Sequence, residues 1–184
     1  MKTDTFKITI HMVSSLDGFI AKKDNDISWM RSTDKYEKGV TITKEYIADF
    51  LKSIDCYVMG SRTYEHALEL GWVYGDTPVV VLTHRDLTTD RKNVEFYSGN
   101  LNKLVNGRLK PNYRTVWLVG GAMVVKDFMR LKLADEIRLS ILPIILGGGT
   151  LFFDHIGQEQ RLHLKDVTAY KDGMVELWYK IEKN

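Results

Sequence analysis

The sequence predicts an α/β fold in which a mostly parallel central sheet is extended by antiparallel strands near the C-terminus. Short apolar runs alternate with segments of helical spacing over residues 7–131, the pattern expected when helices connect parallel strands. After these, strand-like runs follow one another with only turns between them, which favours antiparallel pairing. The 184 residues fit one domain of ordinary size, and we expect a single domain over residues 1–184.

The first elements follow from the spacing of apolar residues. Residues 7–14 are β-rich and end at a turn over residues 15–18. Residues 43–54 carry apolar side chains at helical spacing, and Thr43 is suited to cap that helix. The short apolar run at 56–59 then indicates a buried strand.

The same alternation continues along the chain. Further helices are expected at 63–70, 101–109 and 123–131, and further strands at 78–82, 94–97 and 115–119. The C-terminal strands are expected at 136–146, 162–169 and 175–181, with a turn at 171–173. These last strands are expected to form a meander that completes the sheet.

Composition argues against several classes of protein. There are 26 Lys and Arg against 24 Asp and Glu, and the formal charge of +2, without a local cluster, does not indicate a nucleic-acid surface. No stretch approaches the roughly 20 apolar residues needed to cross a bilayer, and residues 1–10 lack the features of a secretory signal. We therefore expect a cytoplasmic protein with no membrane partner. The single cysteine, Cys56, lies in an apolar run and is expected to be an inert strand residue.

A first candidate phosphate site lies where the strand at 56–59 stops at Gly60. The next three residues, Ser61, Arg62 and Thr63, bring two hydroxyls and a guanidinium to the start of a helix. Free backbone N–H groups and the helix dipole favour an anion there. The alternative is that Ser61 or Thr63 only caps the helix while Arg62 is solvated.

Two more strand ends have similar chemistry. Gly120 and Gly121 follow a buried strand and allow close approach of a pyrophosphate, although most such glycine pairs are simple turns. Thr83, His84 and Arg85 follow another buried strand and suit a phosphomonoester, the group that distinguishes NADP from NAD; the alternative is a polar loop with an incidental arginine. Several such ends in one parallel sheet are what a dinucleotide needs.

These segments together resemble a known family. The resemblance rests on residues 14–21, 28–29, 60–65, 119–121, 133–136, 143–149 and 151–153, which occur in the right order over nearly the whole chain. They resemble the dihydrofolate reductase superfamily, and the closest branch is the C-terminal reductase domain of the bifunctional riboflavin-biosynthesis deaminase/reductase, here in a stand-alone form. The resemblance implies a three-layer fold, NADPH as cofactor, hydride transfer to a small heterocyclic or carbonyl-like substrate, and a homodimer.

The resemblance also implies roles for individual residues. The nicotinamide carboxamide is expected against Val13, Ile20 and Ala21. The phosphates are expected at Gly60, Ser61, Arg62 and Thr63, the adenosine 2′-phosphate at Thr83, His84 and Arg85, and the pyrophosphate at Val119, Gly120, Gly121, Ala122 and Met123. Holding nicotinamide C4 against the acceptor would supply most of the rate enhancement.

The substrate side of the resemblance involves fewer residues. Ser15, Asp17 and Trp29 are expected on the acceptor side, and Asp34 stands where dihydrofolate reductases place a proton-relay carboxylate. The alternative for Asp34 is a solvated residue of the surface segment 34–38. The acceptor stays open between the ribosylaminopyrimidine of flavin synthesis, dihydrofolate and another compound, and a non-catalytic NADPH-binding module is the alternative of a different class. The scattered histidines show no ligand spacing, so no metal is expected.

Overall fold

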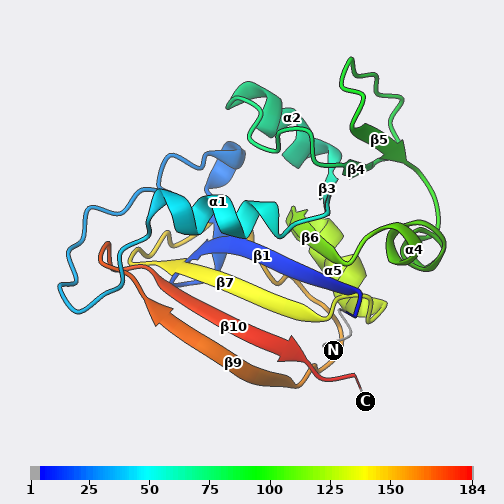
Figure 1. Cartoon of the computed structure of the whole chain (residues 1–184). Helices are drawn as coiled ribbons and strands as arrows, with labels where there is room; N and C mark the ends of the chain where they lie inside the picture. Colours follow the sequence, from blue (N-terminus) through cyan, green and yellow to red (C-terminus); the bar gives the residue numbers. More distant parts are fainter. Residues whose placement is uncertain (1–4, 184) are drawn as a thin grey trace.

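The computed structural model describes residues 5–183 and contains one large sheet with helices on both of its faces (Figure 1). The strands of this sheet are β1 (Lys7–Ser15), β3 (Cys56–Gly60), β4 (Val79–Leu82), β5 (Val94–Tyr97), β6 (Thr115–Gly120), β7 (Glu136–Leu142), β9 (Leu162–Ala169) and β10 (Val175–Ile181). Their order across the sheet is β5-β4-β3-β6-β1-β7-β10-β9. The predicted α/β fold is confirmed.

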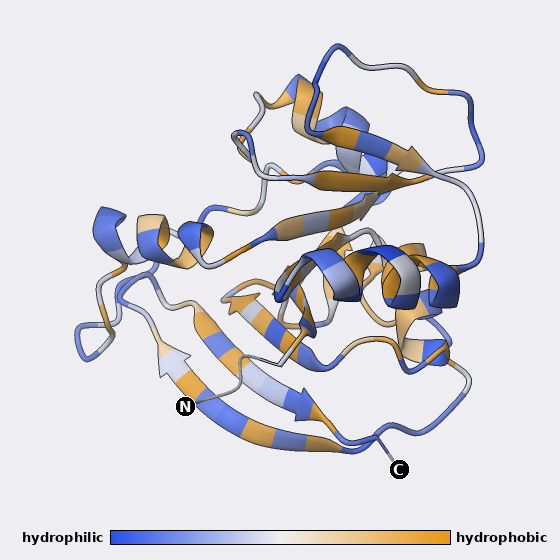
Figure 2. Ribbon diagram, turned by 45° about the vertical axis from the view of Figure 1, so that its right-hand side comes forward, coloured by the Kyte–Doolittle hydropathy of each residue, from blue (hydrophilic) through white to orange (hydrophobic). Residues whose placement is uncertain are grey.

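The sheet divides into a parallel and an antiparallel part. The pairs from β5 to β7 are all parallel, whereas β10 runs antiparallel to both β7 and β9. Hydropathy differs across the sheet, because β3 and β4 are apolar along their length while β9 alternates between hydrophilic and hydrophobic residues (Figure 2). Strands β3 and β4 are buried on both faces, as their near-continuous apolar runs predict.

The helices connect and cover the strands. They are α1 (Lys44–Lys52), α2 (Ser61–Glu69), α3 (Leu101–Leu104), a π-helical turn (Val105–Leu109), α4 (Lys110–Asn112) and α5 (Ala122–Arg130), with a 3-10 turn at Lys23–Asn25. One core packs α3 and α5 on β1, β3 and β6 through side chains such as Ile8, Leu104, Leu118 and Phe128. A second core packs Tyr64 of α2 on Tyr57, Met59, Val79 and Val81 of the opposite face. The helices therefore form two layers around the sheet.

Several predicted boundaries were wrong by a few residues. Helix α2 begins at Ser61 and not at residue 63, because the chain turns from β3 into the helix at Gly60 without a side-chain cap. Strand β7 ends at Leu142 and not at residue 146, where a loop follows. The helix predicted at 101–109 continues to Asn112.

Two very short strands were not predicted. They are β2 (Phe19–Ala21) and β8 (Thr150–Leu151), and they pair antiparallel with each other apart from the main sheet. Runs of two or three residues give too little periodicity to be recognised in a sequence. This small ribbon joins the turn after β1 to the loop after β7.

Cys56 is buried and free, in agreement with the inert role predicted for it. Burial raises the pKa of its thiol to about 12, so the thiolate is scarce at neutral pH.

Candidate functional site

The three strand ends predicted to bind phosphate lie beside one another. Strands β4, β3 and β6 are consecutive in the sheet and mutually parallel, so their carboxyl ends share one edge (Figure 1). Strand β1 comes next in the order, which adds Val13 to the same region. In open parallel sheets, ligands bind outside this edge of the strands.

Two helix N-termini meet at the ends of β3 and β6. Helices α2 and α5 begin directly after Gly60 and Gly121, and no side chain caps either of them. The Thr63 hydroxyl does not cap α2, because it accepts a hydrogen bond from the Gly121 amide at 2.9 Å and so links the two helix starts. Amide groups and positive dipole ends from both helices are therefore concentrated at one place, which favours an anion.

The backbone conformation at Gly120 favours glycine. Its φ of +111° lies in the left-handed region, and a Cβ there would overlap the end of the Met12 side chain on β1. The peptide bond between Gly120 and Gly121 is cis. Gly120 lies against the end of the Met12 side chain, at the edge where the pyrophosphate is expected.

The third strand end contains an ion pair that was not predicted. The guanidinium of Arg85 donates from Nη2 and Nη1 to the two carboxylate oxygens of Glu65 on α2, at 2.6 and 2.9 Å. The hydrogen bond from Arg85 is the main reason that the pKa of Glu65 lies below its usual value. Nearby, the Thr83 hydroxyl accepts from the Arg85 amide at 2.9 Å, and His84 Nδ1 lies 2.9 Å from Ser98 Oγ.

The residues expected at the nicotinamide end lie on two neighbouring elements. Val13 is on β1, whereas Ile20 and Ala21 are buried on β2. The backbone of Gly149 passes so close to Ala21 that a Cβ would overlap the Ala21 carbonyl oxygen. The loop after β7 therefore packs against this part of the site.

Ser15 and Asp17 hold this loop in place. The carboxylate of Asp17 accepts the Ser15 hydroxyl at 2.6 Å and the amides of Leu146 and Gly147 at 3.0 and 2.7 Å. The Ser15 hydroxyl also accepts the amide of Phe19 at 3.0 Å. These hydrogen bonds, that from Ser15 above all, keep the pKa of Asp17 below its usual value. Both side chains thus connect the turn after β1 to the loop after β7, a role that local sequence could not reveal because the partners are far apart in the chain.

The remaining predicted residues lie on the long segment between β2 and α1. Trp29 is buried, and its indole N–H has no hydrogen-bond partner among residues 5–183. Asp34 is exposed, with its carboxylate against Gly173 in the turn between β9 and β10. That turn lies at the same edge of the sheet as Ser15, because Val175 pairs with Ile141 near the end of β7. The exposure agrees with the solvated alternative for Asp34.

A buried charge cluster under α1 was missed at the sequence level. On β7 and β10, Arg138 Nη2 donates to Glu176 Oε1 at 2.6 Å, and on β1 His11 Nε2 lies 3.5 Å from Glu176 Oε2. Burial raises the pKa of Glu176, but the hydrogen bond from His11 and the charge of Arg138 outweigh this, and the net pKa is lowered. Tyr46 and Phe50 of α1 contact Arg138 from above. A single charged residue within a strand does not show, from the sequence alone, which charged residue on a neighbouring strand it will meet.

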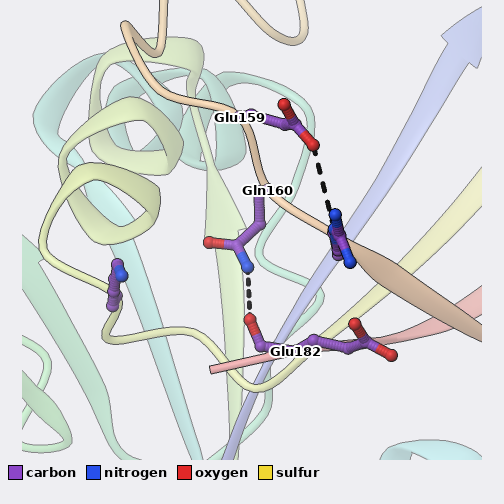
Figure 3. Close-up of a pocket in the computed structure, with 5 residues that line it drawn as sticks. Glu159, Gln160 and Glu182 are labelled. Carbon is purple, nitrogen blue, oxygen red and sulfur yellow. Dashed lines mark hydrogen bonds and ion pairs between the residues drawn. The ribbon is translucent and has the colours of Figure 1, made fainter. Parts of the chain in front are cut away.

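One surface depression lies away from the strand ends. It has a volume of about 350 Å³ and is lined by Lys132, Glu159, Gln160, Arg161 and Glu182, close to the start of β9 and the end of β10 (Figure 3). In it, Gln160 bonds the carbonyl of Glu182, and Arg161 lies 3.9 Å from Glu159. Because β10 is antiparallel, this is the amino edge of the parallel strands, opposite the candidate site.

Within the described part of the chain, no helix is long and apolar enough to cross a membrane. Nor do residues 5–183 contain a group of three or more His, Cys, Asp or Glu side chains arranged to hold a metal ion.

Solved structures share this fold. The crystal structure of a proposed riboflavin biosynthesis protein from Shewanella sp. PV-4 superposes with a TM-score of 0.83 at 21% identity, over 97% of this chain and all of that one. The diaminohydroxyphosphoribosylaminopyrimidine deaminase/5-amino-6-(5-phosphoribosylamino)uracil reductase of Thermotoga maritima matches with a TM-score of 0.68 at 14% identity, over 97% of this chain but 57% of that protein. The architecture is thus that of the predicted dihydrofolate reductase-like fold.

Sequence comparison extends the likeness. The uncharacterized protein YwjB of Bacillus subtilis (strain 168) is 30% identical over 176 residues, which cover 94% of this chain and 97% of that protein. The model of the RibD C-terminal domain matches residues 6–176. The chain therefore belongs to the RibD C-terminal domain family.

Proposed function

We propose that this protein is an NADPH-dependent reductase that delivers hydride to a small heterocyclic substrate, in the manner of 5-amino-6-(5-phosphoribosylamino)uracil reductase. The observation that carries the proposal is the meeting of the strand ends at Gly60, Leu82 and Gly120 along one edge of the sheet. Family membership supports the reductase chemistry, since the Thermotoga maritima protein with this fold is named as such a reductase.

The residues at this edge fit the cofactor. The linked N-termini of α2 and α5 offer amides to the pyrophosphate, and the left-handed Gly120 lets the backbone approach it. Arg62 and Arg85 supply cations for the phosphates, while Val13, Ile20 and Ala21 would hold the nicotinamide carboxamide. The bound dinucleotide supplies the hydride. The chain itself fixes the orientation of the ring and excludes water.

The acceptor would lie on the side of β1 that faces the segment from Trp29 to Asp34. Trp29 offers a buried indole N–H that no other described residue bonds, which suits a hydrogen bond to a polar heterocycle. Asp34, at the same edge, remains the proposed source of the proton, directly or through water.

Turnover separates the candidate functions. We expect NADPH oxidation with a pyrimidine, pteridine or carbonyl acceptor, measured by the loss of absorbance of the reduced nicotinamide. Oxidation with dihydrofolate alone would favour the dihydrofolate reductase alternative. Saturable NADPH binding with no oxidation by any acceptor would favour the non-catalytic binding module.

The arginines are expected to favour NADPH. The Arg62→Ala and Arg85→Ala variants should each weaken NADPH binding about tenfold, because each loses a charge-assisted contact to phosphate. Arg85→Ala should change NADH affinity little, because the expected partner of Arg85 is the 2′-phosphate, which NADH lacks. Titration of both dinucleotides by fluorescence tests this, and equal losses of NADPH and NADH affinity in both variants would contradict the NADP preference.

We also propose that the protein is a homodimer formed through β9. This strand is at one end of the sheet, so one side of its backbone lacks a strand partner within residues 5–183, and Leu162, Leu164 and Val167 are 41, 48 and 51% exposed on it. The unpaired backbone of such an edge strand can form hydrogen bonds to a strand of a second copy of the protein. Sedimentation should give twice the mass of 21.2 kDa, and Leu164→Lys should shift it to the monomer. A wild-type protein that stays monomeric at high concentration would contradict this proposal.

A further inference from the structure

The ion pair between Glu65 and Arg85 joins two of the predicted phosphate-binding segments. Glu65 lies on α2, which starts at the end of β3, and Arg85 follows β4, the neighbouring strand. Both terminal nitrogens of the guanidinium bond the carboxylate, one to each oxygen. The side chains are 55 and 39% exposed for Arg85 and Glu65, so the pair is accessible from solvent.

This pairing occupies the Nη1/Nη2 edge of Arg85, one of the two edges through which a guanidinium can bind a phosphate. A guanidinium binds a carboxylate or a phosphate through the same two parallel N–H groups. A 2′-phosphate at Arg85 must therefore displace Glu65 or share the guanidinium with it. It also brings a phosphate of charge about −1.5 to −2 close to a carboxylate. The lowered pKa of Glu65 means that this carboxylate is ionised at neutral pH.

A dinucleotide that carries a 2′-hydroxyl avoids both costs. The hydroxyl has no charge to be repelled, and the pair with Arg85 can stay intact beside it. The cost of opening the pair is small in absolute terms, because exposed ion pairs are screened by water and salt. This cost nevertheless lowers the affinity for NADPH and leaves the affinity for NADH unchanged.

We propose that Glu65 limits the preference of this protein for NADPH over NADH. It does so by competing with the 2′-phosphate for Arg85. The proposal rests on the proposed function, in that it takes Arg85 as the cation that meets the 2′-phosphate. Glu65 acts here through Arg85 and is a specificity-determining residue, with no part in hydride transfer.

The first experiment measures binding without turnover. Kd is determined by calorimetry for NADPH, NADH, 2′,5′-ADP and 5′-AMP, with wild type, Glu65→Gln and Glu69→Gln. In Glu65→Gln, NADPH and 2′,5′-ADP should bind about fivefold more tightly, the upper range for one exposed ion pair. NADH and 5′-AMP should bind as they do to wild type. Glu69→Gln removes the same charge one turn further along α2 and should change none of the four values.

The second experiment asks whether the effect passes through Arg85. In an Arg85→Ala background, Glu65→Gln should improve the binding of 2′,5′-ADP much less, because only the direct repulsion between Glu65 and the phosphate is left to relieve, so the double-mutant cycle should show a coupling equal to most of the fivefold gain. Thermal unfolding checks that all variants fold; a small shift is expected because the pair is exposed.

Each outcome bears on one of the two proposals. If wild type binds neither NADPH nor NADH, the proposed function fails. If wild type binds NADPH but Glu65→Gln leaves it unchanged or weakens it, the role of Glu65 is wrong while the reductase proposal stands. An equal gain for NADH, or a gain that persists in full without Arg85, would also overturn the role of Glu65.

Discussion

Replacing Gly149 with alanine is expected to lower kcat/KM for NADPH oxidation by about a hundredfold, the loss that a displacement of roughly 1 Å can cause in a positioned site. The residue has a φ of +141°, and a Cβ there would overlap the carbonyl oxygen of Ala21. Backbone cannot give way as a flexible side chain can, so β2 and β8 must move apart, and Ala21 at the end of β2 is displaced. Steady-state kinetics and NADPH titration should both report the loss.

The next residue provides a matched control. Gly148 has open space where its Cβ would stand, so Gly148→Ala should keep wild-type activity. Gly149 is exposed, and thermal unfolding should therefore change much less than activity. If both variants keep full activity, Ala21 does not lie at the nicotinamide as proposed.

Replacing Glu176 with leucine is expected to lower the free energy of unfolding by about 3 kcal/mol, the low end for a buried ion pair that loses one partner. The side chain of Arg138 is only 15% exposed and would keep its charge without the carboxylate. Urea unfolding followed by tryptophan fluorescence measures the change.

A double variant separates loss of the pair from loss of packing. Arg138→Met with Glu176→Leu removes both charges and should recover at least half of the lost stability.

The dependence of stability on pH should change as well. The pKa of Glu176 is lower in the folded protein than its unfolded value near 4.5. The ionised carboxylate therefore stabilises the folded state at pH values above 4.5, and this contribution is lost as the pH falls through the folded pKa. Equal destabilisation of the single and double variants would contradict a paired charge.

Most of the sheet could be predicted because its strands appear in the sequence as distinct apolar runs. Apolar runs such as 56–59 and 115–119 are long enough to be recognised, and the helices between them imply parallel pairing. Helix starts were less accurate. At α2 the first turn follows Gly60 with no capping side chain, and Thr63, which resembles a cap, bonds Gly121 instead.

The candidate site was predictable in its location but not in its internal contacts. The strand ends at Gly60, Thr83 and Gly120 could be expected to meet, since parallel strands place their carboxyl ends at one edge. The partner of Arg85 could not, because Glu65 reaches it only once β3 and β4 lie side by side. The same holds for Asp17, whose backbone partners near Gly147 are distant in the chain.

The central place of β1 affects how the chain can fold as it leaves the ribosome. It precedes the other strands within residues 5–183, yet its two neighbours are β6 and β7, which pair with it through residues 115–118 and 136–142. Both edges of β1 therefore stay unpaired until residues 115–118 are available, and one edge stays unpaired until residues 136–142 follow. Such long-range pairing slows folding and leaves the strand exposed to aggregation until both of its partners are in place.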